Sequence, residues 1–170
     1  NLVCQEARLS PTALYRYFPN KYALLHELGV RLMSSQNVLV ESCLTPEVLM
    51  DPVDRLQPAL VQLFLETYRV TCETPAGHWI IRALRAVPSL QEVRLQSHQA
   101  VTTEMQQGLS MLHPSVDPEQ MRVTVRMSVD MTYASLEMLF DDPTLDVNRV
   151  AQTNAWVVYD MFHRLGTVKR

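Results

Sequence analysis

The 170-residue sequence predicts an all-α protein. Glycine is scarce, with 4 residues, while Leu, Met, Gln, Glu and Arg fill long stretches, and these residue types favour helix. Apolar residues recur three and four positions apart, which is the period of a helix, and strict alternation of apolar and polar residues is absent. Proline and turn residues divide the chain into successive helices.

The first elements are three helices joined by tight turns. A helix fragment covers about 1–7, and a short helix follows at about 11–18, with Ser10 as N-cap and Pro11 at its first position. Asn20 follows Pro19 and can cap a third helix at about 21–43. The predicted apolar face of this third helix comprises Leu25, Leu28, Leu32, Leu39 and Cys43.

The remainder begins with a predicted linker from Thr45 to Pro52. Five further helices follow, separated by connections that contain proline or glycine. Asp117 caps the fourth of them, and Gly166 ends the last. Their predicted ranges are about 52–73, 76–86, 89–112, 118–140 and 145–165.

Each of the last two predicted helices carries two apolar stripes, although a surface helix of a monomer needs only one. The second stripes comprise Met127, Met131, Ala134 and Met138 in the first of these helices, and Ala155, Tyr159 and Phe162 in the other. We expect these residues to form a dimer interface, a four-helix bundle between two copies of the hairpin. The alternative is a hairpin buried inside a larger monomer, but 170 residues leave little protein to cover it.

Charge is distributed unevenly along a chain whose net charge is −3. The first 31 residues are basic, because Arg8, Arg16, Lys21 and Arg31 outnumber Glu6 and Glu27. A basic start on an acidic body is typical of a DNA-contacting end attached to a soluble domain. Chance variation in a short segment is the alternative explanation.

Several function classes are disfavoured. Cys4, Cys43 and Cys72 have no C-x-x-C spacing, which argues against a disulfide framework or a metal site and favours a reducing, cytoplasmic location. No apolar run reaches 18 residues, so we expect no membrane span. The five histidines are scattered, and neither a Gly-rich phosphate loop nor a G-x-S-x-G motif occurs, so we expect no catalytic residues, no cofactor and no enzyme activity.

The segment 3–25 reads as a helix-turn-helix. A helix ends near Ala7, a three-residue turn follows, and the second helix begins at Pro11, with Leu14 and Phe18 predicted to point inward. The small first turn of that helix suits close entry into a major groove. Lys21 lies in the first turn of the next helix, where exposed backbone N–H groups can bind a phosphate.

The run from Leu9 to Leu25 resembles the signature of the tetracycline-repressor (TetR) family, Val-Ser-x-x-x-Leu-Tyr-x-(His/Tyr)-Phe-x-x-Lys-x-x-Leu-Leu. The resemblance implies a repressor that binds a pseudo-palindromic operator in double-stranded DNA as a homodimer. It implies a DNA-binding head and linking helix at 1–43, in which the family's first helix and most of its second have no counterpart, and an effector-binding, dimer-forming body at 44–170. The DNA-binding residues that it implies are Ser10, Pro11, Thr12, Ala13, Tyr15, Arg16, Tyr17 and Lys21.

The resemblance also implies a pocket for a small, apolar or aromatic effector among the middle helices, at about 52–140. Candidate lining residues are Phe64, Tyr68, Trp79, Arg82, His98, Val101, Met105, Met127 and Tyr133. Aromatic and methionine side chains make an adaptable apolar wall, and Arg82 or His98 would hold a polar group. The alternative function is a helical protein-interaction or adaptor domain that binds no DNA. An adaptor would explain the apolar stripes but leave the signature at 9–25 unexplained.

Overall fold

The computed structural model describes residues 2–50 and 55–167, and this part of the chain contains helices and no strand, which confirms the all-α prediction. The elements in chain order are α1 (Leu2–Glu6), α2 (Pro11–Tyr17), α3 (Lys21–Cys43), α4 (Pro46–Met50), α5 (Gln57–Glu73), α6 (Gly77–Ala86), the 3₁₀ turn η2 (Pro88–Leu90), α7 (Gln91–Leu112), α8 (Pro118–Asp141) and α9 (Val147–Thr167).

Side-chain caps fix several of the helix starts, among them those of α2 and α8. Ser10 Oγ accepts a hydrogen bond from the Ala13 amide, and Asp117 Oδ2 accepts one from the Gln120 amide. Each cap satisfies an N–H group that the helix itself leaves unpaired. The segment predicted as a linker instead contains the short helix α4, because Pro46 is suited to a first helical position. The start predicted at 52 lies outside the described residues.

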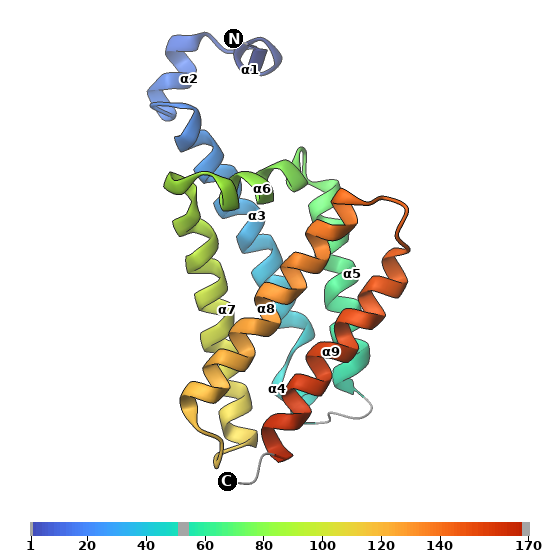
Figure 1. Ribbon diagram of the computed structural model, residues 1–170. Helices are drawn as coiled ribbons and strands as arrows, with labels where there is room; N and C mark the ends of the chain where they lie inside the picture. The colour runs from blue at the N-terminus through green and yellow to red at the C-terminus, as the bar shows by residue number, and fades with distance from the viewer. Residues whose placement is uncertain (1, 51–54, 168–170) are drawn as a thin grey trace.

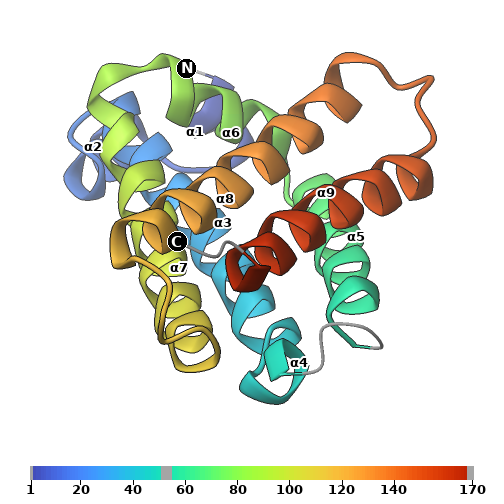
Figure 2. The ribbon, with the colours of Figure 1, turned by 60° about the horizontal axis from the view of Figure 1, so that its bottom comes forward.

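The long helix α3 connects a projecting head to a helical body. Its first half extends away from the body and carries α1 and α2, while its second half lies between α5 and α7 (Figure 1). The antiparallel helices α8 and α9 cover one side of this core, α8 against α7 and α9 against α5 (Figure 2). The head is therefore tied to the body mainly through α3.

Gly29 of α3 lies against Leu84 of α6. A Cβ atom added at Gly29 would lie 2.6 Å from Leu84 Cδ2, so the missing side chain leaves room for Leu84. Both residues are buried, and Leu84 lies in a core cluster with Leu32 and Met33 of α3. The prediction for this helix face missed the glycine and included Leu28, which is 38% exposed.

The side chain of Asn154 ties α9 to α8. Its Oδ1 accepts a hydrogen bond from Thr132 at 3.1 Å, and its Nδ2 donates to Ser135 Oγ at 3.2 Å. Ala155 and Phe162, which were predicted at the interface between copies, instead lie fully buried in the chain's own core, and Tyr159 packs beside them half-buried. Inward packing against α5 explains the apolar spacing at these three positions.

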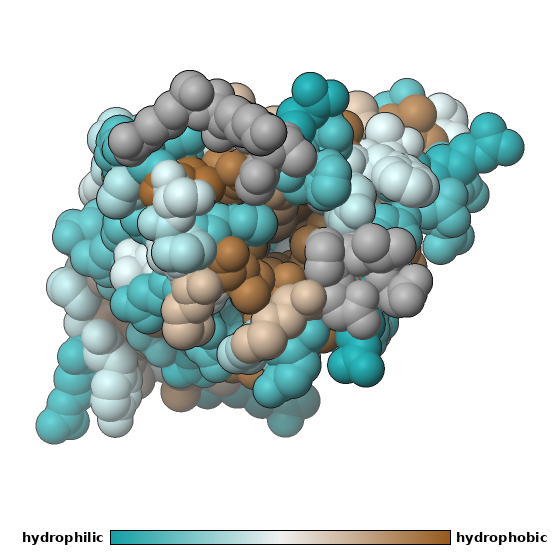
Figure 3. Space-filling view, turned by 90° about the horizontal axis from the view of Figure 1, so that it is seen from below, coloured by the Kyte–Doolittle hydropathy of each residue, from teal (hydrophilic) through white to brown (hydrophobic). Residues whose placement is uncertain are grey.

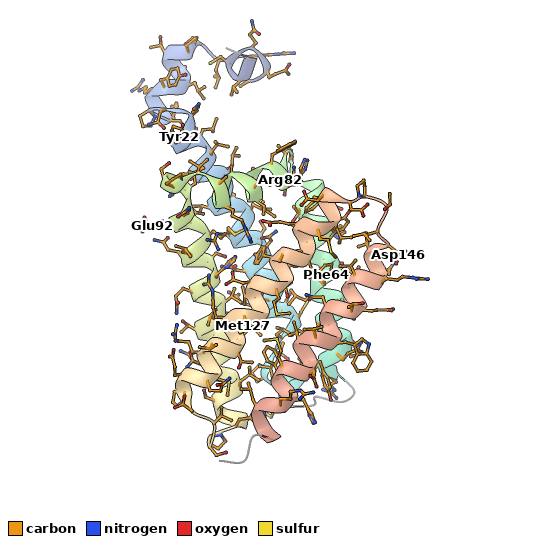
Figure 4. The ribbon with its side chains drawn as sticks, in the orientation of Figure 1. Tyr22, Phe64, Arg82, Glu92, Met127 and Asp146 are labelled. Atoms are coloured by element: carbon orange, nitrogen blue, oxygen red, sulfur yellow. The ribbon has the colours of Figure 1, made fainter. Side chains whose placement is uncertain are left out.

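The outer face of α8 remains apolar and exposed. Val123, Met127 and Met138 are 38%, 51% and 44% exposed, Ala134 is exposed, and Met131 is half-buried. These five residues follow the helical spacing of four and three, so they form one stripe, which we call the α8 stripe. Met127 lies midway along α8 in Figure 4.

Candidate nucleic-acid interface and internal cavity

The turn between α1 and α2 is closed by backbone hydrogen bonds. Arg8 has a left-handed conformation with φ of 51°, and the Leu9 amide donates to the Cys4 carbonyl at 2.9 Å. This pattern ends a helix and reverses the chain direction, and glycine usually occupies the left-handed position. Cys4 itself is 4% exposed and anchors α1, a role that the sequence analysis did not assign.

The short helix α2 presents an open outer side. Thr12, Ala13, Arg16 and Tyr17 follow one another at helical spacing, opposite Leu14 and Phe18. Thr12 and Arg16 are exposed, Tyr17 is 76% exposed and Ala13 is half-buried. This face therefore offers a hydroxyl, a methyl, a guanidinium and a phenol to a partner.

The inner side of α2 is only partly covered. Leu14 and Phe18 were predicted to be core residues, but both are half-buried, and none of the residues of α2 is fully buried. In the described part of the head, the short helix α1 and the start of α3 are the neighbouring elements, and they are too small to enclose two large side chains.

The start of α3 supplies a cation near α2. Lys21 is exposed, and its Nζ lies 5.1 Å from the centre of the Tyr22 ring. Tyr22 is labelled near the start of α3 in Figure 4. Asn20 Oδ1 accepts from the Tyr22 and Ala23 amides at 2.9 and 3.0 Å, so two of the N–H groups predicted to bind phosphate already have a partner. Lys21, rather than the helix terminus, is the stronger phosphate ligand at this position.

The remaining predicted DNA-binding residues also lie on the surface of the head. Ser10 and Pro11 are exposed, and Tyr15 is 48% exposed. The acidic Glu27 pairs with Arg31 at 2.8 Å, which neutralises it next to this surface. The structure thus brings the eight predicted residues together at one end of the molecule, on α2, its cap and the first turn of α3.

The body contains an internal cavity at the far end of α3. The centre of a water-sized sphere can occupy about 60 Å³ of this cavity, which is partly open to solvent. Seen from the end of the body where α4 lies, apolar side chains surround a hollow (Figure 3). Five helices and the α3 C-cap contribute the lining residues, which are Gln36, Val40, Leu44, Leu60, Leu63, Thr67, Val101, Met105, Ser128, Val129, Thr132, Tyr133, Leu136 and Val158.

A buried hydrogen-bonded chain crosses one side of this cavity. The Gln36 side chain, which is 1% exposed, donates from Nε2 to Thr71 Oγ1 at 2.9 Å and accepts at Oε1 from the Tyr133 hydroxyl at 2.8 Å. Burial raises the pKa of Tyr133 well above its usual value, so its hydroxyl stays protonated. The chain joins α3 to α5 and α8.

Three of the nine predicted effector-pocket residues line the cavity: Val101, Met105 and Tyr133. The other six lie elsewhere. Phe64 packs in a separate core cluster, and Tyr68 stacks on Phe140. Trp79 is 59% exposed, and Arg82 lies over its ring and pairs with Asp141. Met127 belongs to the α8 stripe, and His98 lies behind Tyr133. Figure 4 shows Phe64 within the body and Arg82 on α6.

The sequence analysis missed the polar lining residues Gln36, Thr67, Ser128 and Thr132. A search for apolar spacing passes over such positions by design. Gln36 nevertheless falls four residues after Leu32 on the buried face of α3, which is a signal that periodicity offers when polar residues are included.

His98 belongs to a charged cluster beside the cavity. Its ring stacks on Tyr133 with 4.5 Å between ring centres, and its Nδ1 lies 2.9 Å from Asp130 Oδ1. Burial lowers the pKa of His98 to about 4, with the charges of Arg126 and Arg94 adding to the effect and Asp130 opposing it. His98 is therefore neutral at pH 7, donates from Nδ1 to the carboxylate, and brings no positive charge to the cavity.

Among residues 2–50 and 55–167, His, Cys, Asp and Glu nowhere gather in a group of three able to hold a metal ion. In the same residues, each helix is too short or too polar to span a membrane.

A short reading helix, held by a capped turn at the end of a projecting head and joined by one long helix to a helical body, defines a helix-turn-helix DNA-binding protein. Residues 1–28 match the family model described as bacterial regulatory proteins, tetR family. The match covers the head and the start of α3, and it supports a DNA-binding transcriptional regulator of the TetR family. Neither a curated protein nor a solved structure matches it.

Proposed function

We propose that this chain is a cytoplasmic repressor that binds a pseudo-palindromic operator as a homodimer and is released by a small molecule bound in the body. One observation carries the proposal. The helix that begins beside the exposed face of α2 is the same helix, α3, that supplies Gln36 and Val40 to the internal cavity. A ligand in the cavity therefore contacts the element that positions the reading helix.

On DNA, each exposed residue of the head takes a role that its chemistry suits. Thr12 and Ala13 contact base edges in the major groove, with Pro11 beside them, since small side chains allow close approach. Tyr15, Tyr17 and Lys21 donate hydrogen bonds to phosphates. Arg16 shares the outer face of α2 with Thr12 and adds positive charge there, while Ser10 caps the helix.

The α8 stripe supports the dimer. An exposed apolar stripe of Val123, Met127, Met131, Ala134 and Met138 on a charged body is typical of a subunit interface. Val157 of the neighbouring helix α9 is also exposed, at 39%. Two copies joined here would present two reading helices to successive major grooves, about 34–36 Å apart.

Release follows from linkage between the cavity and the head. A ligand shifts the equilibrium between two shapes of the body only if it binds one shape more tightly than the other. A shape in which α3 tilts would move both reading helices away from the groove spacing. We divide the molecule into a head with its linking helix at 1–43 and a body at 44–170, although the second half of α3 packs inside the body.

The test is binding of the full-length protein to labelled DNA from its own promoter region, followed by gel shift and by fluorescence anisotropy over a range of salt concentrations. We expect protection of a pseudo-palindrome and affinity that falls steeply with salt. Replacing Lys21→Ala should weaken binding to all sequences and reduce the salt slope by about 1. Replacing Thr12→Ala should instead relax preference at one base pair in each half-site.

The matched control is Arg122→Ala, which removes an exposed cation from α8, where it pairs with Glu119. Its affinity and salt slope should equal those of the wild type. Salt-independent binding, or equal losses in Lys21→Ala and Arg122→Ala, would show that α2 and Lys21 are not the DNA-contacting surface.

A further inference from the structure

We propose that the internal cavity binds an uncharged, mainly apolar molecule with one hydrogen-bond-donating group, a hydroxyl or an N–H, held at the Gln36 and Tyr133 pair. This deepens the proposed function, because it takes the cavity as the effector site and names the chemical class of the effector. It also assigns Gln36 as the contact through which the ligand reaches α3.

The composition of the wall excludes an ionic ligand. Nine of the lining residues are apolar, and the other five are Gln36, Thr67, Ser128, Thr132 and Tyr133. None of the lining residues is Lys, Arg, His, Asp or Glu. A carboxylate or ammonium group entering this space would lose its hydration without meeting an opposite charge, which is strongly unfavourable.

The hydroxyl groups on the wall have already donated their protons. Tyr133 donates to Gln36 Oε1 at 2.8 Å, Thr67 to the Leu63 carbonyl at 2.7 Å, and Ser128 to the Val125 carbonyl at 2.7 Å. Thr132 shares its proton between the Ser128 carbonyl at 2.9 Å and Asn154 Oδ1 at 3.1 Å. A hydroxyl has one proton but two lone pairs, so what these groups still offer is acceptor capacity. A ligand group that donates satisfies them, and one that only accepts does not.

Gln36 connects the ligand to the head. Its carboxamide links Thr71 of α5 to Tyr133 of α8, and it is the cavity residue nearest in sequence to the reading helix. A ligand that donates to the Tyr133 oxygen enters this chain of hydrogen bonds and changes the position that Gln36 prefers. The contact thus acts on α3 directly, without a change at the surface of the body.

The experiment compares matched probes of three sizes, 1-octanol, 4-ethylphenol and 2-naphthol, each with its methyl ether and with the carboxylate of the same skeleton. Binding to the full-length protein is measured by calorimetry and thermal shift. We expect at least one of the three hydroxyl probes to bind, its ether to bind about tenfold more weakly because one hydrogen bond is lost, and its carboxylate not to bind.

Variants locate the contact. Tyr133→Phe should reduce affinity for the hydroxyl probe about tenfold and leave the affinity for its ether unchanged, and Gln36→Leu should do the same. The matched control is Thr102→Val, which removes a buried hydroxyl that donates to the His98 carbonyl outside the cavity, and it should bind all probes as the wild type does. The wild-type comparison needs no variant, so a variant that fails to fold does not weaken the test.

Tighter binding of a carboxylate than of its hydroxyl partner, equal binding of ether and hydroxyl probes, or no binding by any probe would overturn the proposal. A gel shift with the bound probe separates this result from the proposed function. If the hydroxyl probe binds with the expected selectivity but leaves operator binding unchanged, the ligand class stands and the effector role of the cavity fails.

Discussion

Two buried polar side chains of the body, Gln36 and His98, join helices in different ways. Gln36 joins α3 to α5 and α8 through neutral hydrogen bonds, whereas His98 joins α7 to α8 through the carboxylate of Asp130. A paired buried group costs little, while an unpaired one costs the full desolvation penalty. Removing one member of either pair should therefore matter more than removing an exposed charge.

His98 should make the protein less stable in mild acid. Its pKa is about 4 in the folded state, against 6.5 for the free side chain, because burial disfavours the charged form. The unfolded chain therefore takes up a proton at a higher pH than the folded one, and stability falls as the pH drops from 6.5 through 4. The contribution amounts to about 3 kcal/mol at pH 4.

Urea unfolding at pH 7, 5.5 and 4 measures this loss of stability. His98→Gln should remove the part of the loss that His98 causes. Asp130 causes a further part of the loss of stability, and this part remains in the variant. Burial opposes its ionised form, but the hydrogen bond and charge of Arg126, together with His98, lower its pKa overall. His163→Gln, at an exposed position on α9, is the control and should keep the wild-type pH dependence. If the free energy of unfolding of His98→Gln depended on pH as that of the wild type does, the prediction would be contradicted.

At the scale of elements, the corner between α5 and α6 packs backbone closely against backbone. A Cβ atom at Gly77 would lie 2.1 Å from the Thr71 carbonyl oxygen, which is far inside any allowed contact. The preceding residue, Ala76, has a left-handed conformation with φ of 58°, which costs about 1 kcal/mol for a residue with a side chain. Both neighbouring positions therefore favour glycine, but only position 77 has it.

We expect Gly77→Ala to lower the free energy of unfolding by about 1–3 kcal/mol or more, because the corner must open to admit the methyl group. Ala76→Gly should raise it by about 0.5–1 kcal/mol, since glycine adopts the left-handed conformation without strain. Chemical denaturation of both variants at one pH checks the pair. If both substitutions changed stability in the same direction, the backbone geometry of this corner would not be the cause.

Helix boundaries were more predictable than helix faces. Caps such as Ser10 and Asp117 act locally, so the residues around them are sufficient to place α2 and α8. The faces of α3 and α9 depend on which neighbour packs against them, and that neighbour is distant in sequence. Periodicity therefore grouped Ala155 with an outer surface, although α5 covers it in the structure.

For the whole molecule, the α8 stripe predicts a dimer that one charge can disrupt. Met127→Glu would place two carboxylates near the two-fold axis, where they lose hydration and repel each other. Light scattering coupled to size-exclusion chromatography should show a dimer for the wild type and a monomer for the variant. The monomer should bind a full operator far more weakly, because it presents one reading helix instead of two.

Met111→Glu is the control for this change, because Met111 is 69% exposed and lies at the end of a different helix, α7. It should remain dimeric. A wild-type protein that is monomeric at all concentrations, with its stripe covered by a different protein, would favour an adaptor over a dimeric repressor.

The site was predictable to the extent that its residues lie close together in sequence. The residues proposed to face DNA occupy one stretch, Ser10 to Lys21, so a local signature was enough to propose them, and their roles on DNA stay predictions. The cavity is assembled from five helices, and its lining depends on how those helices cross. Tyr133 could be proposed as an aromatic wall residue, but its hydrogen bond to Gln36 joins positions 97 residues apart.

The contact at Gly29 can act as a pivot point for α3. Leu84 presses on bare backbone there, about 12 Å along the helix from Lys21 and about 10 Å from Gln36, at a rise of about 1.5 Å per residue. Because these two distances are nearly equal, a tilt of α3 about Gly29 moves Gln36 and Lys21 by similar amounts in opposite directions. A bulkier residue at position 29 would shift this pivot. It would change how motion at the cavity is passed to the reading helix without altering the cavity or the reading helix itself.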